Sequence, residues 1–359
     1  MITKRNPEFI GAPDATHAPE TRGMAGIPSL AISPNGRLWA TWYAGKKPAE
    51  DESNYCILAT SSDGGGTWNE ICIVDPDGEG PRRTFDPELW VGPDGCLRWF
   101  WCDRAGTGKS GMDTDMLWMM EIGDPEHVPL NAFPQPRVIG PGVMMNKPIV
   151  LHDGTWALPV SKWFSEKSAE MLVSEDGGKT FHVRGAANIP NDNRTFDEHQ
   201  FVELKNGHLW CLARTKSGIH ESVSTDGGVT WPELRPSPIR HLSSRFFITR
   251  LASGNLLLVK HGQIDVQTTK REQLMAFLSK DDGQTWEGGL LLDERAGISY
   301  PDGQRAADGR IYIVYDFDRF ATGQILFASF TEADVAAGNT ISGRVQLRHV
   351  ISRKPGRCN

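Results

Sequence analysis

Four polar side chains in the second half of the sequence have the chemistry to hold and transform an acidic ligand. They are Glu198, Arg214, Arg271 and Tyr300. An arginine can bind a carboxylate through two parallel hydrogen bonds, a geometry that lysine does not reproduce. Each residue also has a structural interpretation: Glu198 and Arg214 form an ion pair, Arg271 is a solvated loop residue, and Tyr300 is a packed aromatic side chain.

The elements that must position these residues are short strands. Six times the sequence shows a strand-like run, a tight turn such as Asn35-Gly36 or Asp94-Gly95, and a second, more apolar run. Successive turns are about 45 to 60 residues apart, which suits a four-stranded propeller blade. Long amphipathic helical patterns are missing, which disfavours an α/β fold. We predict an all-β fold, a six-bladed β-propeller with four-stranded antiparallel blades, with residues 1–359 as a single domain.

A second repeat supports this architecture. The pattern S-x-D-x-G-x-T-(W/F) occurs at residues 61–68, 174–181, 224–231 and 279–286, each time after a strand-like run. Aspartate can fold back on backbone N–H groups, and glycine accepts the positive φ that a tight turn needs. We interpret this box as a folding device that carries no chemistry. The tail from Arg344 alternates apolar and polar residues, so this tail or the N-terminal segment is expected to complete a blade.

Composition excludes several classes of protein. The formal net charge is −7 and no cluster of lysine and arginine occurs, which argues against nucleic acid and against a basic membrane-binding face. The N-terminus lacks a secretory apolar region and no run is long enough to span a membrane, so a cytoplasmic location is expected. The six cysteines lack metal-ligand spacing, and we expect reduced thiols, no metal and no cofactor. A Cys96–Cys102 disulfide is the alternative.

At these residues the chain resembles the sialidase (neuraminidase) superfamily of six-bladed propellers with Asp boxes. The resemblance implies that Tyr300 is the nucleophile, that Glu198 activates it, and that Arg214 and Arg271 are the second and third of three arginines that hold a substrate carboxylate. It also implies a general acid/base aspartate near the first blade. Glu50-Asp51-Glu52 offers three carboxylates in that loop, and Asp51 is the residue predicted for this role.

The sequence departs from the family pattern at one position. The first arginine of the family precedes Ile-Pro, whereas here Gly26 does. We expect the missing side chain to leave room for a substituent of a different sugar. Other cations, Arg319 among them, are candidates to recover the lost binding. Further residues near strand ends are predicted as substrate contacts: Asp197, His199, Asp302 and Arg319.

The resemblance implies a carbohydrate partner and a retaining exo-glycosidase that acts on a terminal acidic sugar. A tyrosine nucleophile suits such a sugar because it approaches neutral, whereas a carboxylate would be repelled by the carboxylate of the substrate. Two alternatives stay open. One is a uronate-directed lyase, in which a tyrosine or histidine removes a proton next to a carboxylate held by arginine. The other is a carbohydrate-binding propeller without catalysis.

Overall fold

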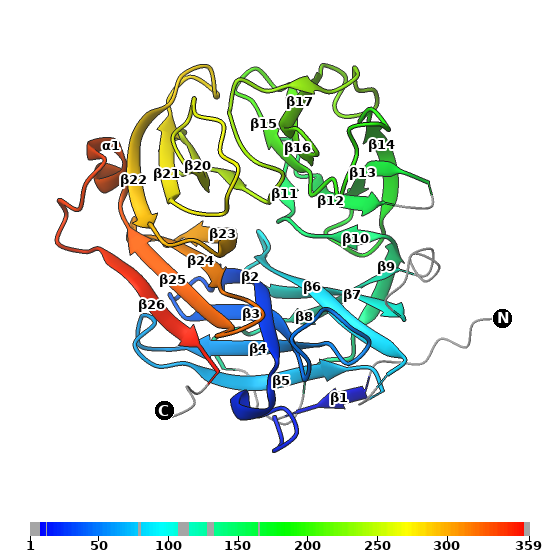
Figure 1. The fold of residues 1–359 in the computed structure, drawn as a ribbon. Helices are drawn as coiled ribbons and strands as arrows, with labels where there is room; N and C mark the ends of the chain where they lie inside the picture. Colours follow the sequence, from blue (N-terminus) through cyan, green and yellow to red (C-terminus); the bar gives the residue numbers. More distant parts are fainter. Residues whose placement is uncertain are drawn as a thin grey trace. The chain divides into compact units, whose positions relative to one another are not determined.

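In the described part of the chain, six antiparallel β-sheets account for nearly all regular structure, and each contains one of the predicted strand–turn–strand units. The computed structural model describes residues 8–11, 13–77, 80–106, 115–127, 133–163 and 166–354. In four of the six sheets, strands that follow one another in the chain are neighbours in the sheet (Figure 1). In the other two, β1 pairs with β5 instead of β2, and β10 and β11 both pair with β12. This arrangement confirms the all-β, six-bladed β-propeller class. The described chain forms two compact units, and the single-domain assignment stays a prediction.

The first unit comprises Met1–Val143, Asp316–Leu326 and Val350–Asn359 and contains the first two blades. Blade one has the order β1-β5-β4-β3-β2, so the short strand β1 extends it beyond four strands. A single 3-10 turn, η1 (Pro19–Thr21), precedes β2. The strands of blade one are β1 (Glu8–Ile10), β2 (Met24–Ile32), β3 (Leu38–Gly45), β4 (Tyr55–Ser61) and β5 (Asn69–Asp75). Those of blade two are β6 (Arg82–Val91), β7 (Leu97–Ala105), β8 (Met116–Ile122) and β9 (Arg137–Pro141).

The second unit comprises Met144–Tyr315 and Phe327–His349 and contains blades four and five and most of blade three. Blade three consists of β10 (Val143–Met144), β11 (Ile149–Val150), β12 (Trp156–Lys162), β13 (Ser168–Ser174) and β14 (His182–Ala187). Blade four consists of β15 (Gln200–Glu203), β16 (Leu209–Thr215), β17 (Gly218–Ser224) and β18 (Arg235–Pro236). Blade five consists of β19 (Phe247–Arg250), β20 (Leu256–His261), β21 (Leu274–Ser279) and β22 (Glu287–Asp293).

The sixth sheet has the order β23-β24-β25-β26 and contributes residues to both units. Its strands are β23 (Ile298–Arg305), β24 (Ile311–Phe317), β25 (Gln324–Phe330) and β26 (Gln346–Ser352), and helix α1 (Glu332–Ala337) precedes the last of them. Thr331 caps α1 through a capping box with Asp334. The tail strand predicted from Arg344 onward therefore begins at Gln346 and completes this sheet.

The four Asp boxes connect the third strand of a blade to the fourth, in blades one, three, four and five. In the first box the Asp63 carboxylate accepts hydrogen bonds from the Thr67 backbone at 2.9 Å, the Thr67 hydroxyl at 2.8 Å and the Ser61 hydroxyl at 2.7 Å. Gly65 donates back to Ser61 at 3.0 Å. These bonds close the turn on itself and lower the pKa of Asp63 to about 2, the Thr67 backbone N–H being the main cause.

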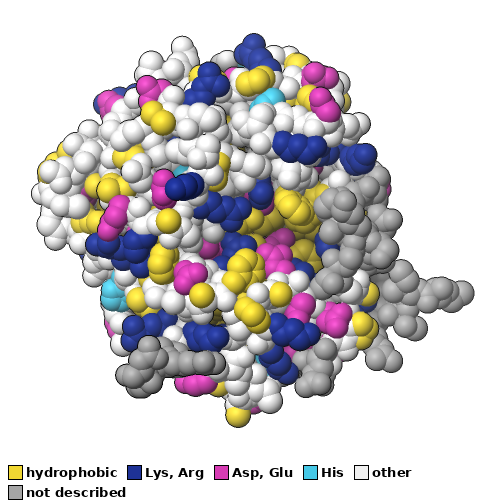
Figure 2. All heavy atoms as spheres, viewed as in Figure 1, with side chains coloured by type: hydrophobic (Ala, Val, Ile, Leu, Met, Phe, Trp, Pro, Cys, Tyr) yellow, Lys and Arg dark blue, Asp and Glu magenta, His cyan; other side chains and the backbone are white. Residues whose placement is uncertain are grey.

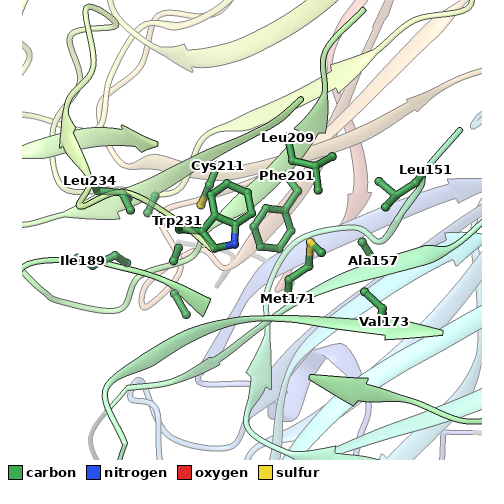
Figure 3. Packing of buried hydrophobic residues seen from close by; sticks show 13 residues of the cluster. Leu151, Ala157, Met171, Val173, Ile189, Phe201, Leu209, Cys211, Trp231 and Leu234 are labelled. Carbon is green, nitrogen blue, oxygen red and sulfur yellow. The ribbon is translucent and has the colours of Figure 1, made fainter. Parts of the chain in front are cut away.

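The aromatic residue of a box can pack between neighbouring blades, and Trp231 is the clearest case. Its ring lies 5.4 Å from the Phe201 ring, centroid to centroid, within a buried cluster drawn from blades three and four (Figure 3). The cluster also includes Met171, Leu209 and Cys211. Large buried apolar surfaces of this kind supply the free energy that holds adjacent sheets together.

The surface carries mixed charge on the face drawn in Figure 2, where lysine and arginine side chains are interspersed with aspartate and glutamate. In the described residues, no helix combines the length and the hydrophobicity required to cross a bilayer. The five cysteines of this part of the chain are free, so the alternative Cys96–Cys102 disulfide is not formed. Cys358 lies outside the described residues.

Candidate active site

Tyr300 and Glu198 both occupy backbone conformations that side chains other than glycine rarely adopt. Tyr300 lies on β23 with φ +55°, and Glu198 lies two residues before β15 with φ +43°; its neighbour Asp197 has φ +25°. Such conformations cost about 1 to 3 kcal/mol each and persist where the surrounding structure imposes them, which is common at functional sites. Both side chains are buried. The left-handed backbone of these two residues does not stabilise the sheets. It sets the direction in which their side chains point.

The two side chains meet through a short hydrogen-bond network. The Tyr300 hydroxyl donates to Glu198 Oε1 at 3.1 Å. Arg214, from the end of β16, donates through Nη1 to the same oxygen at 2.6 Å and to the Tyr300 hydroxyl at 3.3 Å. Three of the four residues singled out in the sequence therefore contact one another directly within the second unit.

The electrostatics of this network favour a permanently charged arginine. Burial opposes the charge on Arg214, but the negative charge of Glu198 and the hydrogen bonds with Glu198 and Tyr300 outweigh it and raise the Arg214 pKa. Glu198 Oε2 is buried and has no hydrogen-bond partner among the described residues. A carboxylate in this position can accept the proton of the tyrosine hydroxyl, while the arginine stabilises the negative charge.

Arg271 completes the group. Its guanidinium carbon lies 5.3 Å from the centroid of the Tyr300 ring, within the range of a cation–π contact. The Arg271 carbonyl accepts a hydrogen bond from the Gly297 backbone N–H at 2.8 Å, which ties its loop to the residue before β23. The structure thus brings a tyrosine, a carboxylate and two arginines together from blades four, five and six.

Two other predicted contact residues, Asp197 and His199, are buried beside Glu198. Burial raises the pKa of Asp197 to about 7, although Arg194 Nε lies 3.2 Å from its carboxylate. The His199 ring lies within hydrogen-bond distance of the Ser161 hydroxyl at 3.1 Å and the Glu170 carbonyl at 2.9 Å, and burial lowers its pKa to about 4. The His199 ring is neutral and both of its nitrogens have partners within the protein. These contacts favour a structural role for His199 over contact with a substrate.

Asp302, also predicted as a substrate contact, is fully buried on β23. Lys147 Nζ lies 2.8 Å from its carboxylate and Arg245 Nη2 lies 3.5 Å from it. Arg245 also donates to the side chain of Asn146, which in turn donates to the carbonyls of Glu198 and His199. Asp302 therefore belongs to a buried polar chain that supports the backbone of Glu198.

In the first unit, the predicted acid/base residue Asp51 is held by its own turn. Its carboxylate accepts from the Ser53 backbone at 2.9 Å and from the Ser53 hydroxyl at 2.6 Å, and Lys47 Nζ lies 3.2 Å away. Burial opposes these bonds, but they prevail and lower the Asp51 pKa. Its neighbour Glu50 faces two arginines instead: Arg319 Nη1 at 3.3 Å and Arg83 Nη2 at 3.8 Å. Glu50 is therefore paired with arginines, whereas Asp51 is bonded within its own turn and to Lys47.

The expectation that Gly26 leaves room for a ligand substituent is wrong. A Cβ placed on Gly26 would lie 2.6 Å from Arg319 Nε and 2.8 Å from its Cδ and Cγ. The side chain of Arg319 therefore fills the space beside Gly26. Asp316 holds Arg319 beside this strand. Its Oδ2 accepts a hydrogen bond from the backbone of Ile27, the residue after Gly26, at 2.8 Å and another from Arg319 Nη2 at 3.0 Å.

The sequence interpretation did not identify one candidate residue, Asp86. Ile27, Asp86 and Tyr300 each have φ near +50° inside the first strand of a blade, and each is followed by proline. The register of β2 shifts next to Ile27, and that of β6 shifts next to Asp86. Asp86 is buried and holds in blade two the position that Tyr300 holds in blade six. The repeated X-Pro step is the sequence signal that identifies it.

Comparison with known proteins agrees with this architecture. Residues 36–313 match the model of the BNR repeat-like domain family. The chain is 25% identical over 330 residues to a sialidase of Micromonospora viridifaciens, covering 81% of this chain and 49% of that protein. It is 26% identical over 322 residues to a sialidase of Bacteroides fragilis (strain YCH46), covering 76% and 56%. The chain spans about half the length of the curated relatives it matches.

Among solved structures, a Hadza microbial sialidase superposes with a TM-score of 0.70 at 20% identity, covering 87% of this chain and 66% of that one. This likeness concerns the fold. The chain is a six-bladed β-propeller that belongs to the BNR repeat-like domain family. The resemblance to the sialidase superfamily is confirmed.

Proposed function

We propose that this protein is a sialidase-type retaining exo-glycosidase that releases a terminal acidic sugar, sialic acid or a related one. The observation that carries the proposal is the contact between the Tyr300 hydroxyl and Glu198, with Arg214 on both groups and Arg271 over the tyrosine ring. The sialidases among its relatives support the reaction class.

In the proposed reaction, the Tyr300 oxygen attacks the anomeric carbon while its proton passes to Glu198. The bond between that carbon and the leaving oxygen breaks as the oxygen takes a proton from a general acid. Water then attacks the anomeric carbon of the tyrosyl–sugar intermediate and gives its proton to the conjugate base of the general acid. The bond between that carbon and the Tyr300 oxygen breaks, Tyr300 recovers its proton from Glu198, and two inversions give net retention. Arg214 and Arg271 hold the substrate carboxylate. The assignment of the general acid/base to Asp51 stays a prediction.

The test is a panel of aryl glycosides of sialic acids and other acidic sugars, with the first-formed anomer of the product identified by NMR. Release of the acidic sugar with retained configuration supports the proposal. An unsaturated product that absorbs near the ultraviolet edge would identify a lyase, and tight binding without turnover would identify a carbohydrate-binding propeller. Either result would overturn the proposed reaction.

A further inference from the structure

Two buried histidines of the second unit lie near the segment that leads into Tyr300, and the proposed reaction uses neither. His261 is the last residue of β20, and His241 lies between β18 and β19. Both are at most 1% exposed. Burial lowers the pKa of His261 to about 4 and the pKa of His241 well below its usual value, and the charges of Arg271 and Lys260 act in the same direction. Both rings are therefore neutral at neutral pH.

His261 is bonded to the strand that carries Tyr300. Its Nε2 lies 2.9 Å from the carbonyl oxygen of Ile298, the first residue of β23. A carbonyl oxygen can only accept, so Nε2 carries the hydrogen of the neutral ring and donates it. One residue earlier, the Gly297 backbone N–H donates to the Arg271 carbonyl at 2.8 Å. The two residues at the start of β23 are thus both held by blade five.

His241 keeps the His261 ring in this orientation. His241 Nε2 lies 3.1 Å from His261 Nδ1 and 3.2 Å from the His261 backbone N–H, and the two rings are stacked with their centroids 5.3 Å apart. The segment that carries His241 is itself fixed, because the Gln267 side chain donates to the His241 carbonyl and the Arg240 backbone N–H donates to the Ile264 carbonyl at 3.0 Å. The His261 ring cannot turn away from β23 without losing these contacts.

These bonds explain how Tyr300 is kept in a strained conformation. Its φ of +55° costs about 1 to 3 kcal/mol and persists only where the surrounding structure imposes it. Ile27 has the same strained φ before a proline in blade one, and there the Asp316 side chain accepts the backbone N–H of the strained residue. In blade six, the imidazole of His261 holds the carbonyl two residues before the strained one.

We infer that His261 is a positioning residue for the nucleophile. Through the Ile298 carbonyl it holds the start of β23 in the conformation that directs the Tyr300 hydroxyl to Glu198. His241 supports it by fixing its ring. The inference rests on the proposed function for the role of Tyr300 as nucleophile, whereas the placement of the Tyr300 ring can be measured without any substrate. Because His261 acts through the backbone of β23, it should affect kcat and not KM.

The experiment compares His261→Gln with His261→Met. Glutamine can present an amide N–H near the position of Nε2, whereas methionine fills a similar volume without a donor. On an acidic aryl glycoside, His261→Met should lower kcat at least about tenfold with KM within about twofold, and His261→Gln should recover most of the loss.

A second readout needs no turnover. The protein is labelled with 3-fluorotyrosine, and the fluorine NMR resonance of Tyr300 is assigned by its absence in Tyr300→Phe. This resonance should shift in His261→Met and return toward its original position in His261→Gln. The resonances of Tyr43 and Tyr55, which lie in the first unit, should stay unchanged in both variants.

The matched control is His220→Met. His220 is a buried histidine of blade four whose ring lies 2.9 Å from the Ser217 hydroxyl and 3.0 Å from the Asn193 amide. Its substitution should change neither kcat nor the Tyr300 resonance, even if it lowers the melting temperature. If His261→Met does not fold, His241→Phe takes its place, since it keeps an aromatic ring beside His261 but removes the nitrogen that holds it, and it should shift the Tyr300 resonance in the same way.

The inference is overturned if the folded variant leaves the Tyr300 resonance unmoved and kcat within about twofold, or if His261→Gln is as impaired as His261→Met. If the unsubstituted protein cleaves acidic glycosides and the resonance does not shift, the inference falls alone. If the unsubstituted protein does not cleave them but the resonance shifts as expected, the proposed function falls and the positioning of Tyr300 by His261 stands.

Discussion

The hydroxyl of Tyr300 lies 3.1 Å from Glu198 Oε1, and both residues reach this contact from left-handed backbone conformations. Neither conformation is needed to build a sheet. Together they place an ionisable pair beside Arg214, in the low-dielectric interior of the second unit. This pair is the part of the molecule on which the proposed chemistry depends most directly.

The Tyr300→Phe substitution tests the nucleophile. We expect kcat for an acidic aryl glycoside to fall at least about a hundredfold, because the attacking oxygen is lost. The fold should survive, since the ring remains packed against Arg271. Steady-state kinetics together with a thermal melt checks both expectations. Full activity in a folded variant would remove Tyr300 from the mechanism.

The prediction that Asp51 is the general acid/base is tested by comparing substrates with good and poor leaving groups. Asp51→Asn should lower kcat at least about tenfold on a sugar leaving group and less on an aryl one, which needs little protonation. Glu50→Gln is the matched neighbour. It should change the two kcat values by the same factor, because Glu50 is paired with Arg319 and Arg83. A selective loss on the sugar leaving group in Glu50→Gln would give the role to Glu50.

Asp302 is expected to act through stability rather than through substrate binding. Asp302→Asn would remove a buried carboxylate that lies close to both Lys147 and Arg245, and breaking such a buried pair typically costs about 3 to 5 kcal/mol. Urea unfolding measures the loss. Arg344→Ala, which breaks an exposed ion pair with Asp308, should cost less than about 1 kcal/mol. A folded Asp302→Asn protein with normal stability and a raised KM would show that Asp302 contacts the substrate.

The Asp boxes predict a difference in acid stability. The pKa of Asp63 is about 2 in the folded protein against 3.8 for an unperturbed aspartate, so its stabilising effect is complete above pH 4 and is lost as the pH falls toward 2. The melting temperature of Asp63→Asn should lie below that of the parent at neutral pH, and the two should converge near pH 2. KM should not change, because the bonds of Asp63 stay within its turn. A constant difference in melting temperature across this range would contradict the explanation.

Local patterns predicted the architecture, and they suggested residues for the candidate site. The Asp boxes and the Asn-Gly and Asp-Gly turns are fixed by short-range bonds, as in Gly36, whose φ is +93° and whose N–H bonds to the Ser33 carbonyl. They therefore appear in the sequence directly. Glu198, Arg214, Arg271 and Tyr300 were singled out because their places relative to these units match the pattern of the family that the sequence resembles.

The remaining features depend on long-range geometry. Three successive carboxylates, Glu50 to Glu52, look equivalent in sequence, and a two-residue hydrogen-bonded turn decides which of them faces the arginines. The filling of the space beside Gly26 depends on Arg319, far away in the chain. No spacing rule predicts that contact, because it forms only after the strands that carry the two residues have come together.

The two hydrogen bonds that Asp316 accepts, from the Ile27 backbone and from Arg319, have a consequence for the order in which the protein folds. The first unit draws on both ends of the chain, with residues 316–326 and 350–359 added to its N-terminal part. During synthesis, blades one and two emerge early but must wait for these late segments, while most of the second unit is contiguous and can fold sooner. The first unit is therefore completed only after most of the second has been synthesised. Until then Ile27 lacks its carboxylate acceptor, because Asp316 has not yet been made.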